Sequence, residues 1–434
     1  MILTKKFQVF PDKESKDKLW DGSDCCVDIW NCGNEQRQMR SGFGKVNLYS
    51  QKKELALLKK EFEDFKRPSS QVLQNVLFSL DRSYKQFFTK LKQGDKRVKR
   101  PKFKSKQYFF SQEYSQPKTS FSIDKESKTL SLAYGKSRND WMHIPFLDSL
   151  PFPSEQVKTC IIHFDSMEKK WYASVTYVFE EVRYQKNNVS LYFDPGSKTT
   201  LTGITSDGNF VEYDIYPLRT LNMSTYKCLD ELISKREKLK PKKSKRAASA
   251  YRRLNRRIKK GFRKINTRTK MYLHRLANDM LDNHPDVQQF YIGDWAKQST
   301  LADTKNDFAN KTINRAVQNN LPLGKLIDYL TYKAKMRGKV VKKFDERGTT
   351  RTCTKCNKQH PKGVGTTVRT FQCLDTVHCN FRFSRDHHSC LNFIKQFEPA
   401  LWRCLVEQDN LPTRSEKRTF APFSLKSQVY SYPL

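Results

Sequence analysis

Apolar side chains recur along this chain with two spacings, and the two predict different elements. Between residues 69 and 91 they return every three or four residues, which is the spacing of one helix face. Between residues 159 and 178, two runs rich in β-branched and aromatic side chains flank a short charged turn and predict a hairpin. A short strand is expected at the start, through Phe7 and Val9. The amino-terminal part of the chain therefore combines β structure with helices.

The second half follows a different order, which begins after a polar break at residues 185–188. Three antiparallel strands are predicted first, then a long helical region, a strand, a helix and another strand, with a further helix after Asp386. The predicted bounds are 189–193, 198–205, 209–215, 224–282, 289–292, 313–336 and 339–344. This order is typical of an α/β domain with an RNase H-like fold. The stretch beyond about Glu398 is expected to be irregular.

The long helical region is strongly basic. Residues 235–270 contain 18 Lys and Arg side chains and one acid, Glu237. An apolar seam that includes Ile258 and Ile265 runs through it, and Pro241 is expected to divide it into two antiparallel helices. A basic run is often a solvated helix face. The seam instead indicates that one side is packed, so the cationic side would face a polyanion.

Charge extends this picture to the whole protein. The chain has 434 residues and a formal net charge of +37, and a surplus of this size favours nucleic acid as a partner. At 37% hydrophobic and 12% aromatic residues, it is too apolar for a disordered basic tail. No apolar run approaches the roughly 20 residues of a membrane span, and the start lacks a secretory signal. We therefore expect a soluble, intracellular protein without a membrane partner.

Four of the 11 cysteines have metal-like spacing. Cys353 and Cys356 form a knuckle, and Cys373 and Cys379 follow after a linker. Four thiolates suit one tetrahedral Zn²⁺ with no open position, which indicates a structural site. The second pair is spaced more widely than usual, so His378 is an alternative fourth ligand.

Two acids stand at positions suited to metal chemistry. Hydrolysis of a phosphodiester by two Mg²⁺ requires carboxylates that clamp the ions, and few acids are available in this basic chain. Asp194 ends an apolar strand, although Asp before Pro-Gly also commonly forms a turn. Asp386 begins a predicted helix, where an acid is also favoured by the helix dipole.

Together these features resemble the split RuvC nuclease of the TnpB proteins, and especially their eukaryotic and viral relatives, the Fanzor proteins, which are related to miniature type V CRISPR effectors. The resemblance covers nearly the whole chain. It is carried by Asp194-Pro-Gly, by the four-cysteine ribbon followed by Arg385-Asp386, and by the segments 5–11, 80–88, 100–106, 331–338 and 349–353. Each is weak alone, but their order and spacing are specific.

One departure from the family pattern concerns the middle carboxylate. Bacterial members end the central strand in Glu, whereas this chain has Gly293 at the matching place. Fanzor proteins resemble this chain in that respect: their Glu is moved to the last core strand, where this chain has Glu346. Asp294 is the rival, and a site without the middle carboxylate is the third reading. The pair His387-His388, directly after Asp386, is a second departure from the family pattern. These histidines could bind metal, but we expect them to form a polar helix start near phosphate.

The resemblance implies an RNA-guided, Mg²⁺-dependent endonuclease that binds a guide RNA similar to omega RNA and a double-stranded DNA target. Residues 1–185 would form a wedge β-barrel (about 1–12 and 107–185) with an inserted helical recognition domain (about 13–106). Residues 186–397 would form the RuvC domain with a zinc ribbon at about 349–383, and 398–434 would be a tail of unknown role. Two Mg²⁺ would be bound by Asp194, Glu346 and Asp386. The expected nucleic-acid contacts are Lys99, Arg100, Lys102, Lys104, Arg252, Arg253, Arg256, Arg257, Lys259 and Lys260.

Two other functions remain open from the residues alone. A catalytically silent nucleic-acid-binding regulator would be consistent with Gly293, and a DNA-strand-transferring transposase would use a similar acidic triad. We expect a monomer. Basic runs such as 240–246 resemble nuclear import signals, so a nuclear location is expected in a eukaryotic host, or the site of viral DNA if the protein is virus-encoded.

Overall fold

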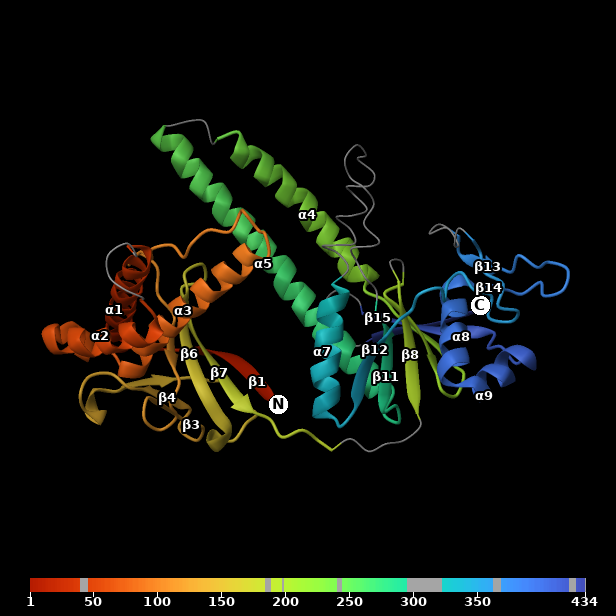
Figure 1. Ribbon diagram of the computed structural model, residues 1–434, viewed down its shortest axis with the longest axis horizontal. Coiled ribbons are helices and arrows are strands. Elements are labelled where there is room, and N and C mark those ends of the chain that lie inside the picture. Colours follow the sequence, from red (N-terminus) through yellow and green to blue (C-terminus); the bar gives the residue numbers. More distant parts are fainter. Residues whose placement is uncertain are drawn as a thin grey trace. The chain divides into compact units, whose positions relative to one another are not determined.

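The computed structural model describes residues 1–39, 46–183, 189–196, 199–239, 244–294, 322–361, 368–420 and 427–433, and for 420 and 427–433 the backbone alone. The chain divides into two compact units, Met1–Glu180 and Glu181–Leu434. Figure 1 shows the elements of both. Within the described residues, no helix combines the length and the apolar character needed to span a membrane.

The first unit contains two open sheets. Strands β1 (Ile2–Val9), β7 (Lys170–Val178), β6 (Val157–Asp165) and β2 (Gln112–Tyr114) form one in that order, and β3 (Phe121–Asp124), β4 (Thr129–Leu132) and β5 (Met142–Pro145) form the other. β6 and β7 are the predicted antiparallel hairpin. Among the described residues the two sheets are separate ladders that an isolated bridge between Val9 and Phe146 joins, and the wedge β-barrel stays a prediction. Helices cover the apolar sheet surface, so closure is not needed to bury it.

Three helices complete this unit: α1 (Lys13–Gln38), α2 (Leu48–Glu61) and α3 (Ser70–Lys92), the last at the predicted position. Leu19, Leu80, Ile162 and Trp171 illustrate that helices and strands contribute to one hydrophobic core. The helical region predicted as an inserted domain is therefore part of the same compact unit. Arg37 ties the helices together, because it is buried on α1 and pairs with Asp81 of α3 at 3.0 Å.

The second unit is built on a seven-stranded sheet in the order β12-β11-β8-β9-β10-β15-β16. Strands β8 (Ser190–Pro195), β9 (Leu201–Thr205) and β10 (Phe210–Tyr213) are consecutive and antiparallel. β11 (Gln289–Gly293) lies parallel to both β8 and β12 (Val340–Phe344). The predicted order of strands and helices is confirmed. Because β8, β11 and β12 are parallel, their carboxyl ends meet at one edge of the sheet.

Both faces of the sheet are buried at β8, β9 and β10, which explains why a strand such as β8 reads as a nearly continuous apolar run. Leu191 and Phe193 of β8 pack with α5 (Lys245–Asp282) and α7 (Leu323–Met336) in one core. Tyr192 projects the other way and packs with α8 (Arg385–Phe397) in a second core. Figure 1 shows α7 and α8 on opposite sides of the strands. The predicted helix at 313–336 is confirmed from Leu323 onward; residues 313–321 lie outside the described residues.

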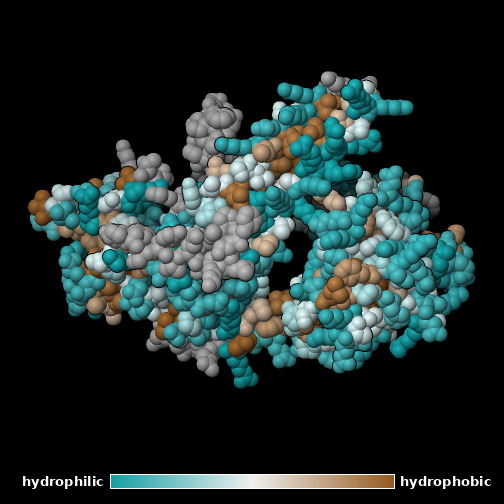
Figure 2. All heavy atoms as spheres, turned by 180° about the vertical axis from the view of Figure 1, so that it is seen from behind, coloured by the Kyte–Doolittle hydropathy of each residue, from teal (hydrophilic) through white to brown (hydrophobic). Residues whose placement is uncertain are grey.

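The basic region forms the predicted helix pair, α4 (Tyr216–Glu237) and α5, which contact each other along their length. Ser244 caps α5 by accepting a hydrogen bond from the Ala247 backbone N–H. Leu229 of α4 packs against Ile258 and Ile265 of α5, so the apolar seam is buried. Figure 2 shows hydrophilic side chains projecting from the pair beside hydrophobic strips. Pro241 lies outside the described residues.

The prediction that the chain is irregular beyond about Glu398 is wrong, because the described residues after Glu398 fold into the second unit. After α9 (Pro399–Trp402) and a π-helical turn (Arg403–Glu407), β15 (Arg414–Phe420) pairs in parallel with β10, and β16 (Ser427–Pro433) extends the sheet. β15 has few apolar residues and pairs with a strand about 200 positions earlier in the chain. Neither local periodicity nor sequence proximity reveals such a strand.

Candidate active site

The candidate site begins at the carboxyl end of β8. Asp194 is 8% exposed, on the face of the sheet that α8 covers. Burial raises the pKa of Asp194 well above its usual range, and the nearby Glu346 and Asp386 carboxylates raise it further. Arg385 and a hydrogen bond from Ser389 act in the opposite direction. Asp194 therefore lies close enough to both Glu346 and Asp386 to be repelled by their carboxylates.

Gly293 and Glu346 fit together at the ends of two neighbouring strands. Gly293 pairs with Phe344 of β12, and Glu346 follows two residues later. A Cβ atom built on Gly293 would lie 2.1 Å from Glu346 Oε2 and 3.0 Å from Pro195 Cδ. The Glu346 carboxylate therefore occupies the space that a side chain at position 293 would need. A glycine is required there because any larger residue would displace the carboxylate.

Asp294, the rival for the middle carboxylate, has a different environment. Its side chain is 61% exposed and lies 3.1 Å from Lys343 Nζ. Its backbone N–H donates to the Phe344 carbonyl at 2.8 Å, which continues the ladder between β11 and β12. A one-residue step along a strand turns the side chain to the other face. The geometry favours Glu346.

Asp386 lies in the first turn of α8, with its side chain 20% exposed and 3.4 Å from Arg385 Nε. α8 packs on β8 and β9, which brings this turn to the Asp194 side of the sheet. Asn392, further along α8, donates to the Thr349 and Thr352 carbonyls at 2.6 and 2.8 Å. It therefore holds the segment that follows Glu346 against the helix. In the sequence, only the position of Asn392 within the predicted helix points to this role.

The donor set fits a hard divalent cation. Glu346 Oε2 is buried and has no hydrogen-bond partner among the described residues, and the pKa of Glu346 is raised to about 7 by burial first and then by Asp294 and Asp345. A cation would relieve both penalties, and carboxylate oxygens are the ligands that Mg²⁺ prefers. Among the described residues, these acids do not form a single-ion group like that of the cysteines described below. Carboxylates at a phosphodiester-cleaving site can instead share two ions about 4 Å apart.

The expectation of a polar helix start at His387 and His388 is wrong, because both rings are buried, at 2% and 0% exposure. His388 stacks on Phe371 with ring centroids 3.7 Å apart, and its Nε2 accepts from the Thr354 backbone N–H. Burial lowers the pKa of His388 to about 3 and that of His387 to about 4. These are packed neutral rings, since aromatic neighbours from the ribbon and sheet cover them.

The four predicted zinc cysteines converge. Sγ atoms of Cys353, Cys356, Cys373 and Cys379 all lie within 4.8 Å of one another, the one such group of three or more His, Cys, Asp or Glu found among the described residues. Two of the Sγ pairs are 3.4 and 3.7 Å apart. Zn–S bonds of about 2.3 Å in a tetrahedron place the sulfurs roughly 3.8 Å apart, so the set fits one Zn²⁺.

His378 is excluded as the fourth member of this group. Its side chain is 84% exposed and pairs with Asp375 at 3.2 Å. Asp375 also accepts from Lys358 at 2.7 Å, and hydrogen bonds from Lys358 and the His378 backbone hold the pKa of Asp375 below its usual range. The residues between Cys373 and Cys379 thus form a small turn around Asp375, which accounts for the long spacing of this pair. Strands β13 (Thr370–Gln372) and β14 (Arg382–Ser384) flank it.

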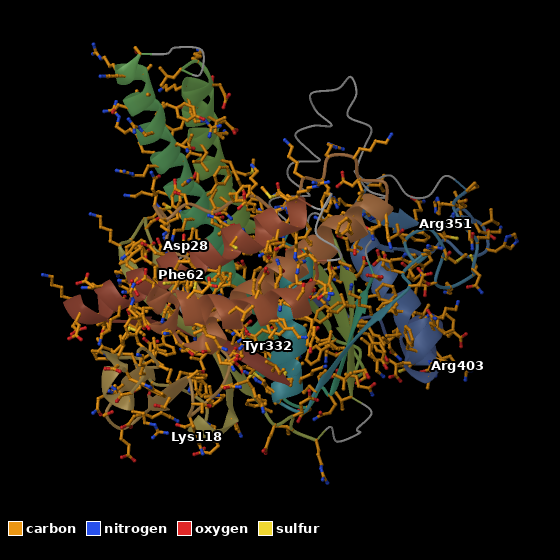
Figure 3. All side chains as sticks on the ribbon, turned by 60° about the vertical axis from the view of Figure 1, so that its left-hand side comes forward. Asp28, Phe62, Lys118, Tyr332, Arg351 and Arg403 are labelled. Atoms are coloured by element: carbon orange, nitrogen blue, oxygen red, sulfur yellow. The ribbon has the colours of Figure 1, made fainter. Side chains whose placement is uncertain are left out.

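The predicted nucleic-acid contacts on α5 are all exposed. Arg252, Arg253, Arg256, Arg257, Lys259 and Lys260 lie on the helix surface away from buried Ile258. Figure 3 shows side chains ending in nitrogen projecting outward from the α4–α5 pair. The helix thus presents a cationic face, and its use by nucleic acid stays a prediction.

The second basic segment, residues 99–104, is held in an extended conformation by side chains of α1. Trp30 and Asn34 donate to the carbonyls of Lys102 and Pro101 at 3.0 and 3.1 Å, and Asn31 exchanges hydrogen bonds with the Lys104 backbone. These side-chain contacts satisfy the backbone of an extended segment. The side chains of Lys99, Arg100, Lys102 and Lys104 consequently remain exposed.

Residues 324–393 match the family model described as Cas12f1-like, TNB domain. The match spans most of α7, β12, Glu346, the cysteine group and Asp386. Among solved structures, the chain is similar to a Cas12f1–sgRNA–target DNA complex, with 13% identity, 90% of this chain and 98% of that chain covered and a TM-score of 0.31. It is also similar to a CRISPR-Cas12f ternary complex, with 13% identity, coverage of 88% and 81%, and a TM-score of 0.35. No curated protein sequence matches.

Proposed function

We propose that this chain is an RNA-guided DNA endonuclease in which an RNase H-like domain of the RuvC type cuts the target. The observation that carries the proposal is the Glu346 carboxylate seated over Gly293, beside the buried Asp194 and the first turn of α8. Three carboxylates at adjoining strand and helix ends are an unfavourable arrangement without cations. They are a suitable one for holding metal ions.

Asp194, Glu346 and Asp386 would hold two Mg²⁺. Bound there, the ions supply charge stabilisation for the attacking and leaving oxygens of a phosphodiester. The protein contributes geometry: β8 positions Asp194, the space above Gly293 receives Glu346, and Asn392 holds the segment that follows Glu346. Cys353, Cys356, Cys373 and Cys379 would hold one structural Zn²⁺ beside this site.

Guide RNA and target DNA are the proposed partners, on three grounds. The chain carries a net charge of +37. Its cationic side chains are exposed on α5 and on residues 99–104. Residues 324–393 match a Cas12f1-like domain. Contacts of this kind bind phosphates and leave sequence reading to base pairing. Within the wider TnpB-like group, the relocated Glu346 favours the Fanzor branch.

A catalytically silent regulator has less support than the sequence alone allowed. That alternative depended on an empty middle position, whereas the Glu346 carboxylate fills the space above Gly293. The transposase alternative shares the acidic residues and differs in its need for RNA.

The test uses the intact protein with the RNA that copurifies. That RNA is sequenced, and a plasmid matching its variable segment is incubated with the complex and Mg²⁺. We expect cleavage that Asp194→Asn abolishes and that RNase treatment before assay prevents. Cleavage that survives RNase treatment would favour the transposase, and full cleavage by Asp194→Asn would refute the catalytic assignment.

A further inference from the structure

A row of paired residues crosses the second sheet beneath α8. Asp194 on β8 pairs with Thr202 on β9, which in turn pairs with Glu212 on β10. Lys417 on β15 is the partner of Glu212 on the other side. Residues directly opposite one another in register project to the same face of a sheet. The row therefore leads from a candidate metal ligand to a lysine of the C-terminal strand, on the face that α8 covers.

Lys417 balances two buried carboxylates. Glu212 and Asp214 are 5% and 3% exposed, and Lys417 Nζ lies 3.2 Å from Asp214 Oδ2 and 3.9 Å from Glu212 Oε2. A buried carboxylate is costly unless a cation or hydrogen bonds accompany it. β15 therefore does more than widen the sheet, because its lysine places a cation beside the buried carboxylates of Glu212 and Asp214.

Glu212 reaches α8 through His387. Nε2 of His387 lies 3.6 Å from Glu212 Oε1, and Nδ1 lies 2.8 Å from Ser384 Oγ. The ring also meets Phe210 edge-on, with centroids 4.8 Å apart. The imidazole is thus hydrogen-bonded at Nδ1 and packed against Phe210, while Nε2 faces the Glu212 carboxylate beyond hydrogen-bond distance. Since His387 directly follows Asp386 in a helix, fixing one fixes the direction of the other.

A second contact, one helical turn further on, sets the register of α8. The Cys390 thiol is fully buried and donates to the Thr202 carbonyl at 3.3 Å. Burial raises the pKa of Cys390, and the carboxylates of Asp194, Asp386 and Glu212 add to that shift. Cys390 therefore lies among the acids of the row. With contacts at both His387 and Cys390, the helix start has little freedom to slide or rotate over the sheet.

We propose that Glu212, His387 and Lys417 are positioning residues. They anchor the first turn of α8 to the sheet and thereby set the Asp386 carboxylate relative to Asp194 for binding a divalent metal. This inference rests on the proposed function. It also assigns the C-terminal strand a role in the site, because Lys417 lies in the stretch for which the sequence predicted no regular structure.

The test measures Mn²⁺ affinity of the full-length protein by the EPR signal of free Mn²⁺, with Asp194→Asn defining binding outside the site. His387→Phe keeps the aromatic contact with Phe210 and loses both ring nitrogens. We expect about tenfold weaker Mn²⁺ binding, since groups that orient metal ligands contribute roughly 10- to 100-fold to affinity. His387→Gln places an amide near the Nε2 position, and we expect affinity within about threefold of wild type.

His284→Phe is the matched control. His284 is partly buried and its Nε2 lies 2.9 Å from the Tyr213 hydroxyl, and Tyr213 projects to the opposite face from its neighbour Glu212. This variant removes an imidazole that contacts the same sheet from its opposite face, so it should lower the thermal stability similarly and leave Mn²⁺ affinity unchanged. Lys417→Met changes the opposite end of the row of paired residues, and it should weaken Mn²⁺ binding as His387→Phe does.

Wild-type Mn²⁺ affinity in His387→Phe would overturn the inference and leave the proposed function in place. An equal loss of affinity in His284→Phe would also overturn it, because general destabilisation would then be the cause. A wild-type affinity no greater than that of Asp194→Asn would instead overturn the proposed function, and its positioning residues with it.

Discussion

Replacing Gly293 by alanine is expected to impair cleavage while leaving the fold intact. The added Cβ would lie 2.1 Å from Glu346 Oε2, against 3.4 Å or more in an ordinary contact, so the carboxylate must move by more than about 1 Å. A misplacement of about 1 Å in a catalytic group costs on the order of 100-fold in rate, or about 2.7 kcal/mol of barrier. The nearest obstacle is the end of a flexible side chain, and Pro195 Cδ at 3.0 Å needs to shift only slightly, so the free energy of unfolding should fall by no more than about 1–2 kcal/mol.

The assay is the initial rate of cutting of a guide-matched plasmid, with binding of the same plasmid measured in parallel. Gly324→Ala serves as the control, because a Cβ on Gly324 of α7 meets nothing within 4 Å. A second variant, Gly293→Glu combined with Glu346→Ala, returns the carboxylate to β11. It should cut faster than Gly293→Ala, since it restores a carboxylate to the same space.

Cutting at the wild-type rate by Gly293→Ala would refute this reasoning, since Glu346 would then function from another position. Loss of plasmid binding together with cutting would also count against it, because the carboxylate is assigned no part in binding.

Three other outcomes follow from the structure. The pKa of Glu346 is raised from 4.5 to about 7 in the folded state, so the folded protein holds a proton that the unfolded chain releases, and it loses stability as pH rises through this window. Without added divalent metal, the free energy of unfolding of Glu346→Gln in urea titrations should exceed that of wild type by about 1–2 kcal/mol at pH 8, after solvent screening, and equal it at pH 4. A difference that does not change with pH would contradict this. Lys339 is 7% exposed and donates to three backbone carbonyls at 2.6–2.8 Å, so Lys339→Met should lower the free energy of unfolding by about 2–4 kcal/mol in urea titrations. Lys342→Met, at an exposed position of the strand β12 that follows, should change it by less than about 0.5 kcal/mol. Cys379→Ser should lose most bound zinc by elemental analysis and His378→Ala should keep it; the reverse result would restore His378 as the ligand.

The strands around the site could be predicted because burial on both faces leaves continuous apolar runs, as in Leu191 and Phe193. The cysteine group could be predicted as well, since thiolate pairs at knuckle spacing have few other uses. Choosing Glu346 over Asp294 depended on a resemblance, and the contact with Gly293 then supplied a physical reason.

Other parts of the site depend on contacts that sequence does not reveal. Burial of His387 and His388 results from aromatic rings on the sheet and ribbon, Phe210 and Phe371, which are distant in the chain. Lys417 lies on a polar strand whose partner, β10, precedes it by about 200 residues, so no local pattern marks the pairing. Local periodicity carries no trace of interactions between segments so far apart in the chain.

The most direct test of the central claim, that Glu346 supplies the middle carboxylate, compares plasmid cutting by Glu346→Gln and Asp294→Asn at equal nucleic-acid binding. Asp294 loses only an exposed pair with Lys343, so Asp294→Asn should cut at close to the wild-type rate. Glu346→Gln should cut about 1000-fold more slowly, because one metal-holding charge is removed. Normal cutting by Glu346→Gln, with loss in Asp294→Asn, would contradict the account.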